Sequence, residues 1–222
     1  MSENESNGGA EVVQRYRCAF RFSITGDLRF ISHHDTLRLF KRALARAALP
    51  VRFSEGFNPQ PRITLPLPRP VGIASDDETL VVDFTEPIDP SAAANRLEQQ
   101  MPPDLVMHDA RRLGPRERLQ PDEVRYRLDL ESPPPADLEA RIRRIIEAKT
   151  LLVERTSPKY EQPRSIDIRP YLVDIHLDGD TMAFTLRVTD GGTARPAEIG
   201  GLLGFDPAGI NHRIHRTRIR WR

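Results

Sequence analysis

The feature that most constrains the fold of this 222-residue chain is an alternation of apolar and other residues that occurs twice. In residues 16–24 every second side chain is apolar, and the positions between them carry arginine, alanine or serine. Residues 124–130 repeat the pattern, with valine, tyrosine and leucine on one side and arginine or aspartate on the other. A period of two predicts a β-strand with one buried face, so each stretch predicts a strand whose second face is basic.

Each of these strands begins a similar succession of elements. In the first half we expect a helix from the Ser32 N-cap to about Ala48, strands at 62–67 and 80–84, a helix from Asp89-Pro90 to Met101, and a strand at 105–113. In the second half we expect a helix at 136–149, strands near 151–156, 171–177 and 181–189, a hairpin turn at 178–180, a helix at 196–203 and a final strand in HRIHRTRIRW. The order β-α-β-β-α-β and its restart predict an α+β fold of two tandem ferredoxin-like halves with antiparallel sheets.

Composition along the chain places the boundaries. Residues 1–14 are small, polar and acidic and predict a disordered leader, while the polar, proline-containing GPRERLQPDE at 114–123 predicts a linker. The two ferredoxin-like halves are therefore expected at 15–113 and 124–222. Two short segments also resemble each other, PRITLPLP from residue 61 and PRSIDIRP from residue 163, which supports duplication of one half to give the other.

Charge and cysteine content exclude several classes of protein. The net charge is +1, and there is neither a long apolar run nor a basic and apolar signal region, so we expect a soluble cytoplasmic protein with no membrane partner. The one cysteine, Cys18, excludes a disulfide framework, a cysteine zinc site or an iron–sulfur cluster held by this chain alone. His33, His34 and Asp35 are consecutive on a helix and cannot all reach one ion, so we expect no metal site.

Arginines on the uncovered face of the predicted sheets form the first candidate binding surface. Helices on one face leave the other open, and such open faces bind RNA in many proteins, although no RNP1-like motif is present. The alternative is a solvated face, or one that packs the two halves together. The alternation assigns to this face Arg15, Arg17, Arg21, Arg125, Arg127, Arg187, Arg216, Arg218, Arg220 and Arg222, with Thr217, Ile219 and Trp221 opposite.

The first helix and the loop after it supply two further candidates. Arg38, Arg42 and Arg46 follow one helical stripe beside Lys41, which either an anionic partner or acidic residues elsewhere in the fold would neutralise. The loop SEGFNPQPR, residues 54–62, is long and rich in proline, which favours a binding loop over a spacer. We expect Gly56, Asn58 and Arg62 at the mouth of a cleft within reach of His33 or His34.

Four segments also carry a family resemblance. RFISHHDTLRLFKRAL, LPVRFSEGFNPQPRITLPLPRPVGI, PRSIDIRPYL and the terminal RTRI, in this order, resemble the radical SAM-linked protein family, whose DUF2344 domain has no established activity. The resemblance covers nearly the whole chain from about residue 15. It implies a domain fused to a radical SAM domain or encoded beside one, often near ribonuclease G. Because this chain lacks the C-x-x-x-C-x-x-C motif, it looks like the stand-alone form, with S-adenosylmethionine and the iron–sulfur cluster expected only on a partner.

These observations favour a non-catalytic accessory or substrate-recognition protein that works with a radical SAM protein on RNA. The alternatives are an RNA-processing or RNA-modifying enzyme in its own right, and a protein-interaction scaffold. The candidate binding residues are His33, His34, Arg38, Arg42, Ser54, Gly56, Asn58, Arg62, Arg164, Arg169, Arg218 and Arg220.

Overall fold

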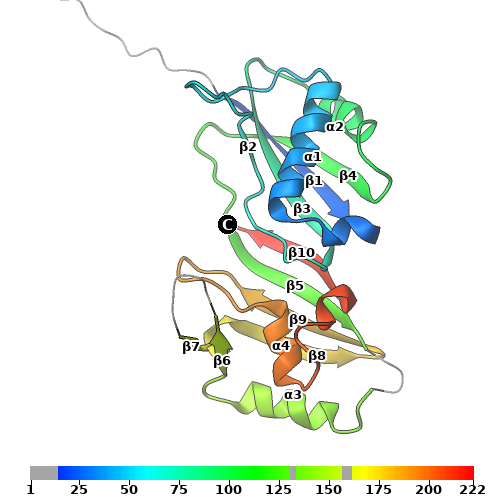
Figure 1. Ribbon diagram of the computed structural model, residues 1–222, viewed down its shortest axis with the longest axis vertical. Helices are drawn as coiled ribbons and strands as arrows, with labels where there is room; N and C mark the ends of the chain where they lie inside the picture. Colours follow the sequence, from blue (N-terminus) through cyan, green and yellow to red (C-terminus); the bar gives the residue numbers. More distant parts are fainter. Residues whose placement is uncertain (1–14, 131–133, 157–161) are drawn as a thin grey trace, which may run out of the picture.

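The computed structural model describes residues 15–130, 134–156 and 162–222, whose strands form one large sheet and one small two-stranded sheet (Figure 1). The predicted leader, residues 1–14, lies outside the described residues. The first half contains β1 (Tyr16–Ile24), the 3-10 helix η1 (Gly26–Phe30), α1 (His33–Arg46), β2 (Ile63–Thr64), β3 (Ala74–Phe84), α2 (Pro90–Glu98) and β4 (Leu105–Leu113). The second half contains β5 (Pro121–Asp129), α3 (Leu138–Glu147), β6 (Leu152–Arg155), β7 (Arg164–Asp167), η2 (Arg169–Tyr171), β8 (Leu172–Asp178), β9 (Thr181–Arg187), α4 (Pro196–Leu202), η3 (Ile210–Arg213) and β10 (Ile214–Trp221).

Local signals at the ends of these elements act as the sequence predicts. The Ser32 hydroxyl accepts a hydrogen bond from the backbone N–H of Asp35, and the Asp89 carboxylate caps α2 in the same way. The turn between β8 and β9 has Gly179 at a positive φ of 60°, which a two-residue hairpin requires. These helices and the hairpin confirm the α+β assignment.

The strands of the two halves join into a single sheet, which the sequence did not predict. Its order is β4-β1-β3-β10-β5-β9-β8, with the short β2 paired to the other end of β3. All neighbouring strands are antiparallel except β3 and β10, which run parallel where His215 lies opposite Ala74. β1 and β5, the two strands with the strongest alternation, each lie between two neighbours.

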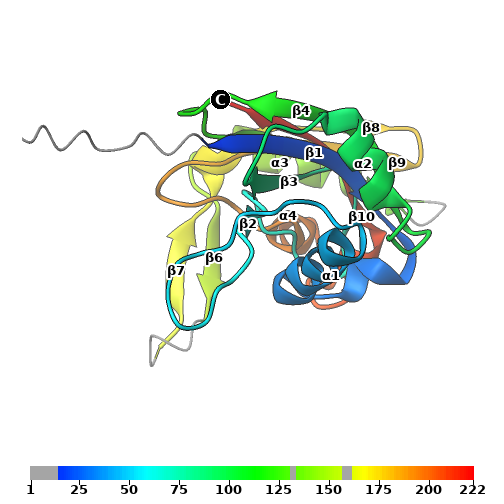
Figure 2. The same cartoon turned by 90° about the horizontal axis from the view of Figure 1, so that it is seen from above.

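Helices cover one face of this sheet (Figure 2). In the first half α1 and α2 pack on the buried side of β1, where Cys18, Phe20, Phe22 and Ile24 are each at most 2% exposed. In the second half α3 and α4 cover the apolar side of the strands around Val124, Tyr126 and Leu128. The alternation therefore predicted correctly which side chains of β1 and β5 face the helices.

Two segments differ from the predicted arrangement. The strand expected near 151–156 pairs with β7 and forms a separate hairpin outside the large sheet. β5 begins at Pro121, inside the segment expected to be a linker. No helix in the described parts of the chain is long and apolar enough to span a bilayer.

Candidate nucleic-acid interface

Consecutive acidic residues of β3 bind β10 where the two halves meet, at what we call the β3–β10 seam. Asp76 lies 2.8 Å from the ring of His215, and the Asp77 carboxylate accepts the backbone N–H of Ile219 at 2.7 Å. Arg216 donates to Glu78 at 2.8 Å, and both side chains are nearly inaccessible to solvent. The seam therefore joins the halves by polar contacts from a stretch that the sequence analysis did not single out.

The seam corrects one assignment to the open face. Arg216 points to the helix side, because a register shift between Arg216 and Arg218 changes the alternation along β10. Although burial lowers the pKa of Arg216, the Glu78 carboxylate and Tyr126 raise it overall above its usual value. Arg216 is thus a buried, charged structural residue.

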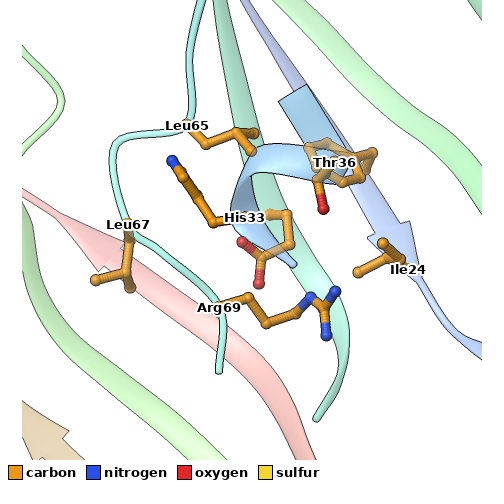
Figure 3. A pocket seen from close by; sticks show the side chains of 8 residues that line it. Ile24, His33, Thr36, Leu65, Leu67 and Arg69 are labelled. Atoms are coloured by element: carbon orange, nitrogen blue, oxygen red, sulfur yellow. The ribbon is translucent and has the colours of Figure 1, made fainter. Parts of the chain in front are cut away.

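A small pocket opens beside this ion pair (Figure 3). His33 and Thr36 of α1 face Ile24 of β1 and the segment that carries Leu65, Leu67 and Arg69. Glu78 also lines it. Burial, and to a smaller extent the neighbouring His34, lower the pKa of His33 below its usual value, against the opposing effect of Glu78.

The guanidinium of Arg69 is bound by the protein itself and is not available to a ligand in this pocket. Its guanidinium donates to the backbone carbonyls of Leu28, Arg29 and Ile31 and also to that of Ile73. The free space in the pocket suffices for about one water molecule. The arrangement serves to fix η1 and the start of α1 against the segment before β3.

The other predicted residues of α1 lie away from this pocket. His34 is exposed, with its ring 5.9 Å from that of His33. Arg38 pairs with Asp35 at 2.9 Å, and Arg46 donates to the backbone carbonyl of Gln100. Arg42 is exposed, and no other described residue binds its side chain. Asp35 of the same helix thus pairs with one of the three arginines in the predicted stripe, and a backbone carbonyl outside the helix binds another.

The proline-rich loop projects from the body instead of closing a cleft at His33. Residues 55–60 are all exposed, and a Cβ atom at Gly56 would meet nothing within 4 Å. The loop meets α1 at Lys41, whose ammonium donates to Gln60 at 2.9 Å, about two turns beyond His33. The structure therefore does not bring Ser54, Gly56 and Asn58 together with the His33 pocket.

Arg164 and Arg169 lie in the second half, at the hairpin and just after it. Arg164 is an exposed residue of β7. Arg169 donates to the backbone carbonyls of Ile146, Ala148 and Leu172, so it holds the end of α3 against the start of β8. Like Arg69, Arg169 precedes a proline and binds several backbone carbonyls.

In the first half, the connection between β4 and β5 covers part of the face expected to be open. Leu119 packs on a small apolar cluster of Ala19, Val81 and Leu113. Arg17 donates to the backbone carbonyl of Glu117 and pairs with Asp83. This half of the face is thus partly covered.

In the second half the open face is organised as rows of side chains across β10, β5 and β9. The Glu123 row contains Arg220, Glu123 and Arg187; the Arg125 row contains Arg218, Arg125 and Thr185; the Arg127 row contains His215, Arg127 and Ala183. In the first of these rows a carboxylate lies between two arginines, 3.0 Å from Arg220 and 3.8 Å from Arg187. In the last, Arg127 pairs with Asp129 and His215 with Asp76.

The Arg125 row holds two cations and no carboxylate. Arg125 and Arg218 lie directly opposite each other on adjacent strands, and no other described residue binds either side chain. Beside them Thr185 is only 5% exposed, and its hydroxyl has no hydrogen-bond partner in the described structure. All three line a shallow hollow that also contains Arg220 and Trp221 and, from the neighbouring row, Glu123. Like charges placed opposite each other in a sheet are unfavourable, and a bound anion would relieve them.

Sequence reasoning identified Arg125, Arg218 and Arg220 but missed Asp77, Glu78 and Thr185. The run Ser75-Asp76-Asp77-Glu78, just before the strand predicted at 80–84, was the available signal for the seam, because carboxylates that become buried require partners. Nothing local distinguishes Thr185 from the other threonines.

No metal-binding cluster occurs in the described part of the chain, where no group of three His, Cys, Asp or Glu side chains could hold an ion. Burial raises the pKa of the Cys18 thiol, against the opposing effect of Arg112. Cys18 therefore packs as an apolar side chain on the helix side of β1.

The fold and the surface together define an α+β protein with a mostly antiparallel eight-stranded sheet that has helices on one face and an arginine-bearing second face. The chain belongs to the DUF2344 family, which is described as an uncharacterized protein conserved in bacteria; the match covers residues 15–196. No curated protein matches the sequence.

Proposed function

We propose that this protein is a non-catalytic recognition protein that binds RNA on the open face of its second half and works with a radical SAM enzyme. The RNA part of the proposal rests on the Arg125 row. Its two arginines face each other with no carboxylate in the row, and the Thr185 hydroxyl beside them has no hydrogen-bond partner in the described structure. Guanidinium groups bind phosphate through their planar fork, and a hydroxyl can donate to a phosphate oxygen.

We also propose that each half is a ferredoxin-like unit. The strand orders β4-β1-β3-β2 and β10-β5-β9-β8 are equivalent when the strands of each half are numbered in chain order, with the β6–β7 hairpin as an insertion. The open faces of sheets covered by helices on one side are surfaces that RNA-binding domains use. This equivalence supports a face suited to nucleic acid.

Two further observations support the proposal. The first favours a protein that binds RNA over an enzyme that modifies it, and the second favours a protein that works together with a radical SAM enzyme. The His33 pocket has room for about one water molecule, and Arg69 and Arg216 within or beside it are held by internal partners. The resemblance to radical SAM-linked proteins supports the radical SAM partner, which would carry S-adenosylmethionine and the iron–sulfur cluster. Co-purification with a radical SAM protein encoded beside this one tests that part of the proposal.

Binding of single-stranded RNA at several salt concentrations tests the RNA part. Arg125→Gln and Arg218→Gln should each weaken binding and reduce the slope of log affinity against log salt by about 0.7, the value for one phosphate contact with a single strand. Arg220→Gln should have a smaller effect, because Asp122 and Glu123 already hold Arg220. Fluorescence anisotropy of a labelled oligonucleotide measures both quantities.

The matched control is Arg143→Gln, which removes the same charge from an exposed position on α3, on the other side of the sheet. It should leave affinity and salt slope close to those of the unmodified protein. Binding that is absent or insensitive to salt would overturn the proposal, and so would an equal loss in the Arg143 and Arg125 variants.

A further inference from the structure

Residues 52–62, which we call the aromatic loop, form a constrained projection. At its base the Ser54 backbone N–H donates to the carbonyl of Gln60 at 2.8 Å, and the Gln60 N–H donates to the Ser54 hydroxyl at 2.9 Å. Phe53 and Pro61 form an isolated β-bridge just below, and Pro59 restricts the returning strand. The loop is therefore held in one shape without contact between its tip and the protein body.

An aromatic side chain occupies that tip. Phe57 is fully exposed, and Phe53 at the base is 52% exposed. Gly56 has a φ of 118°, a conformation that side chains rarely adopt, so the backbone bends sharply just before the ring. A large apolar ring in water is unfavourable, and a fixed loop that presents one is typical of an aromatic anchor for a ligand.

The surroundings of the ring are polar and basic. Lys41 contacts the loop through Gln60, and Arg62 follows its last proline with a side chain that no other described residue binds. The amides of Asn58 and Gln60, joined at 3.3 Å, supply hydrogen-bond donors and acceptors close to the ring, while Glu55 is the one acidic residue of the loop.

We infer that Phe57 is a stacking platform for an unpaired base, with Asn58 and Gln60 positioned to bind the edge of that base. Single-stranded RNA is recognised by aromatic stacking and by hydrogen bonds to base edges. The inference rests on the proposed RNA-binding function and adds a second contact point to the Arg125 row. The loop, cyan in Figure 1, projects in Figure 2 on the side of the sheet where α1 lies, whereas the C-terminal end of β10 lies on the other side. An RNA strand that contacts both must therefore pass around the edge of the sheet.

The test uses single-stranded RNA of about 4 and about 12 nucleotides that carries the fluorescent base 2-aminopurine, whose emission falls when the base stacks. With the longer RNA, Phe57→Ala should lower affinity about 5- to 150-fold, the equivalent of one lost base–aromatic stack, and should abolish quenching. Phe57→Trp should retain both signals, whereas Phe57→Leu keeps an apolar side chain without a stacking ring and should lose the quenching. The short RNA should bind the Arg125 row with little dependence on Phe57.

The two proposals fail in different ways. If Arg218→Gln weakens RNA binding and Phe57→Ala does not, the loop has another partner and the stacking inference is wrong while the RNA-binding function stands. Equal affinity and quenching for Phe57→Leu and the unmodified protein would also overturn stacking, because an apolar contact alone would then suffice. Binding of Phe57 to anionic lipid vesicles or to a copurified protein, with no effect on RNA, would assign the loop to a membrane or a protein instead.

Discussion

At the scale of single residues, Arg216 and Glu78 form the most deeply buried ion pair described in this protein, with the two side chains 2% and 6% exposed. The guanidinium also lies 5.7 Å from the ring centre of Tyr126 and donates to its hydroxyl. Its Nε has no hydrogen-bond partner in the described structure. A pair in this position is costly to desolvate, so its main effect is to require that β3 and β10 meet in one register.

Glu78→Gln should therefore lower the free energy of unfolding by about 3–5 kcal/mol, because it leaves the Arg216 charge buried without a counter-ion. The double variant Glu78→Leu and Arg216→Met should recover most of this loss, since no buried charge then remains. Urea unfolding measures both. The matched control is Arg220→Met, whose side chain is exposed, and a loss in the Glu78→Gln variant no larger than in this control would contradict the prediction.

At the scale of elements, the end of α4 depends on Gly204, which follows the helix predicted at 196–203. Gly204 has a φ of 86°, and the N–H of the next residue donates to the carbonyl of Gly200. A Cβ atom at this position would lie 2.2 Å from the guanidinium of Arg141, which donates to the carbonyl of Leu203. The residue thus combines a left-handed backbone with a close contact from α3.

Gly204→Ala should lower the free energy of unfolding by about 1–2 kcal/mol, because alanine is strained at this φ and Arg141 must move. Gly191→Ala is the control: its φ is not in the left-handed region, and its nearest new contact would be an ordinary 3.6 Å. Thermal unfolding followed by circular dichroism compares the two. The assignment of Gly204 as an obligatory helix end fails if both variants melt together with the unmodified protein.

At the scale of the whole molecule, the β3–β10 seam joins the strands of the two halves of the chain into one sheet. β10 completes the second half, yet its neighbour on one side belongs to the first, and Asp77 holds its backbone at Ile219. The halves should consequently unfold together, in one transition.

Trp221, the only tryptophan, lies at the end of β10 and reports on the second half, while far-ultraviolet circular dichroism reports on both. The two signals should change at the same temperature and denaturant concentration. In Asp77→Ala, which leaves the buried N–H of Ile219 without its acceptor, we expect the transitions to separate or both midpoints to fall. Two separate transitions in the unmodified protein would show that the halves are independent.

Much of this structure follows from short-range patterns that can be recognised in the sequence. The alternation in β1 and β5, the caps at Ser32 and Asp89 and the turn after Asp178 each depend on a few neighbouring residues, so periodicity and turn chemistry predicted them. The arginines of the second half were assigned to the open face on the same basis. That assignment holds for Arg125, Arg218 and Arg220, which line one hollow on the open face, because alternate side chains of a regular strand point to the same face of the sheet.

The tertiary structure alone decided which strands would meet. A single register shift in β10 moved Arg216 from the open face into the interior, and parallel pairing with β3 merged two expected sheets into one. The Arg125 row arises in the same way, since its two arginines and Thr185 come from three strands and only the strand order makes them neighbours. Contacts between residues far apart in the chain depend on the free energy of the whole packed sheet, and no local pattern encodes that energy.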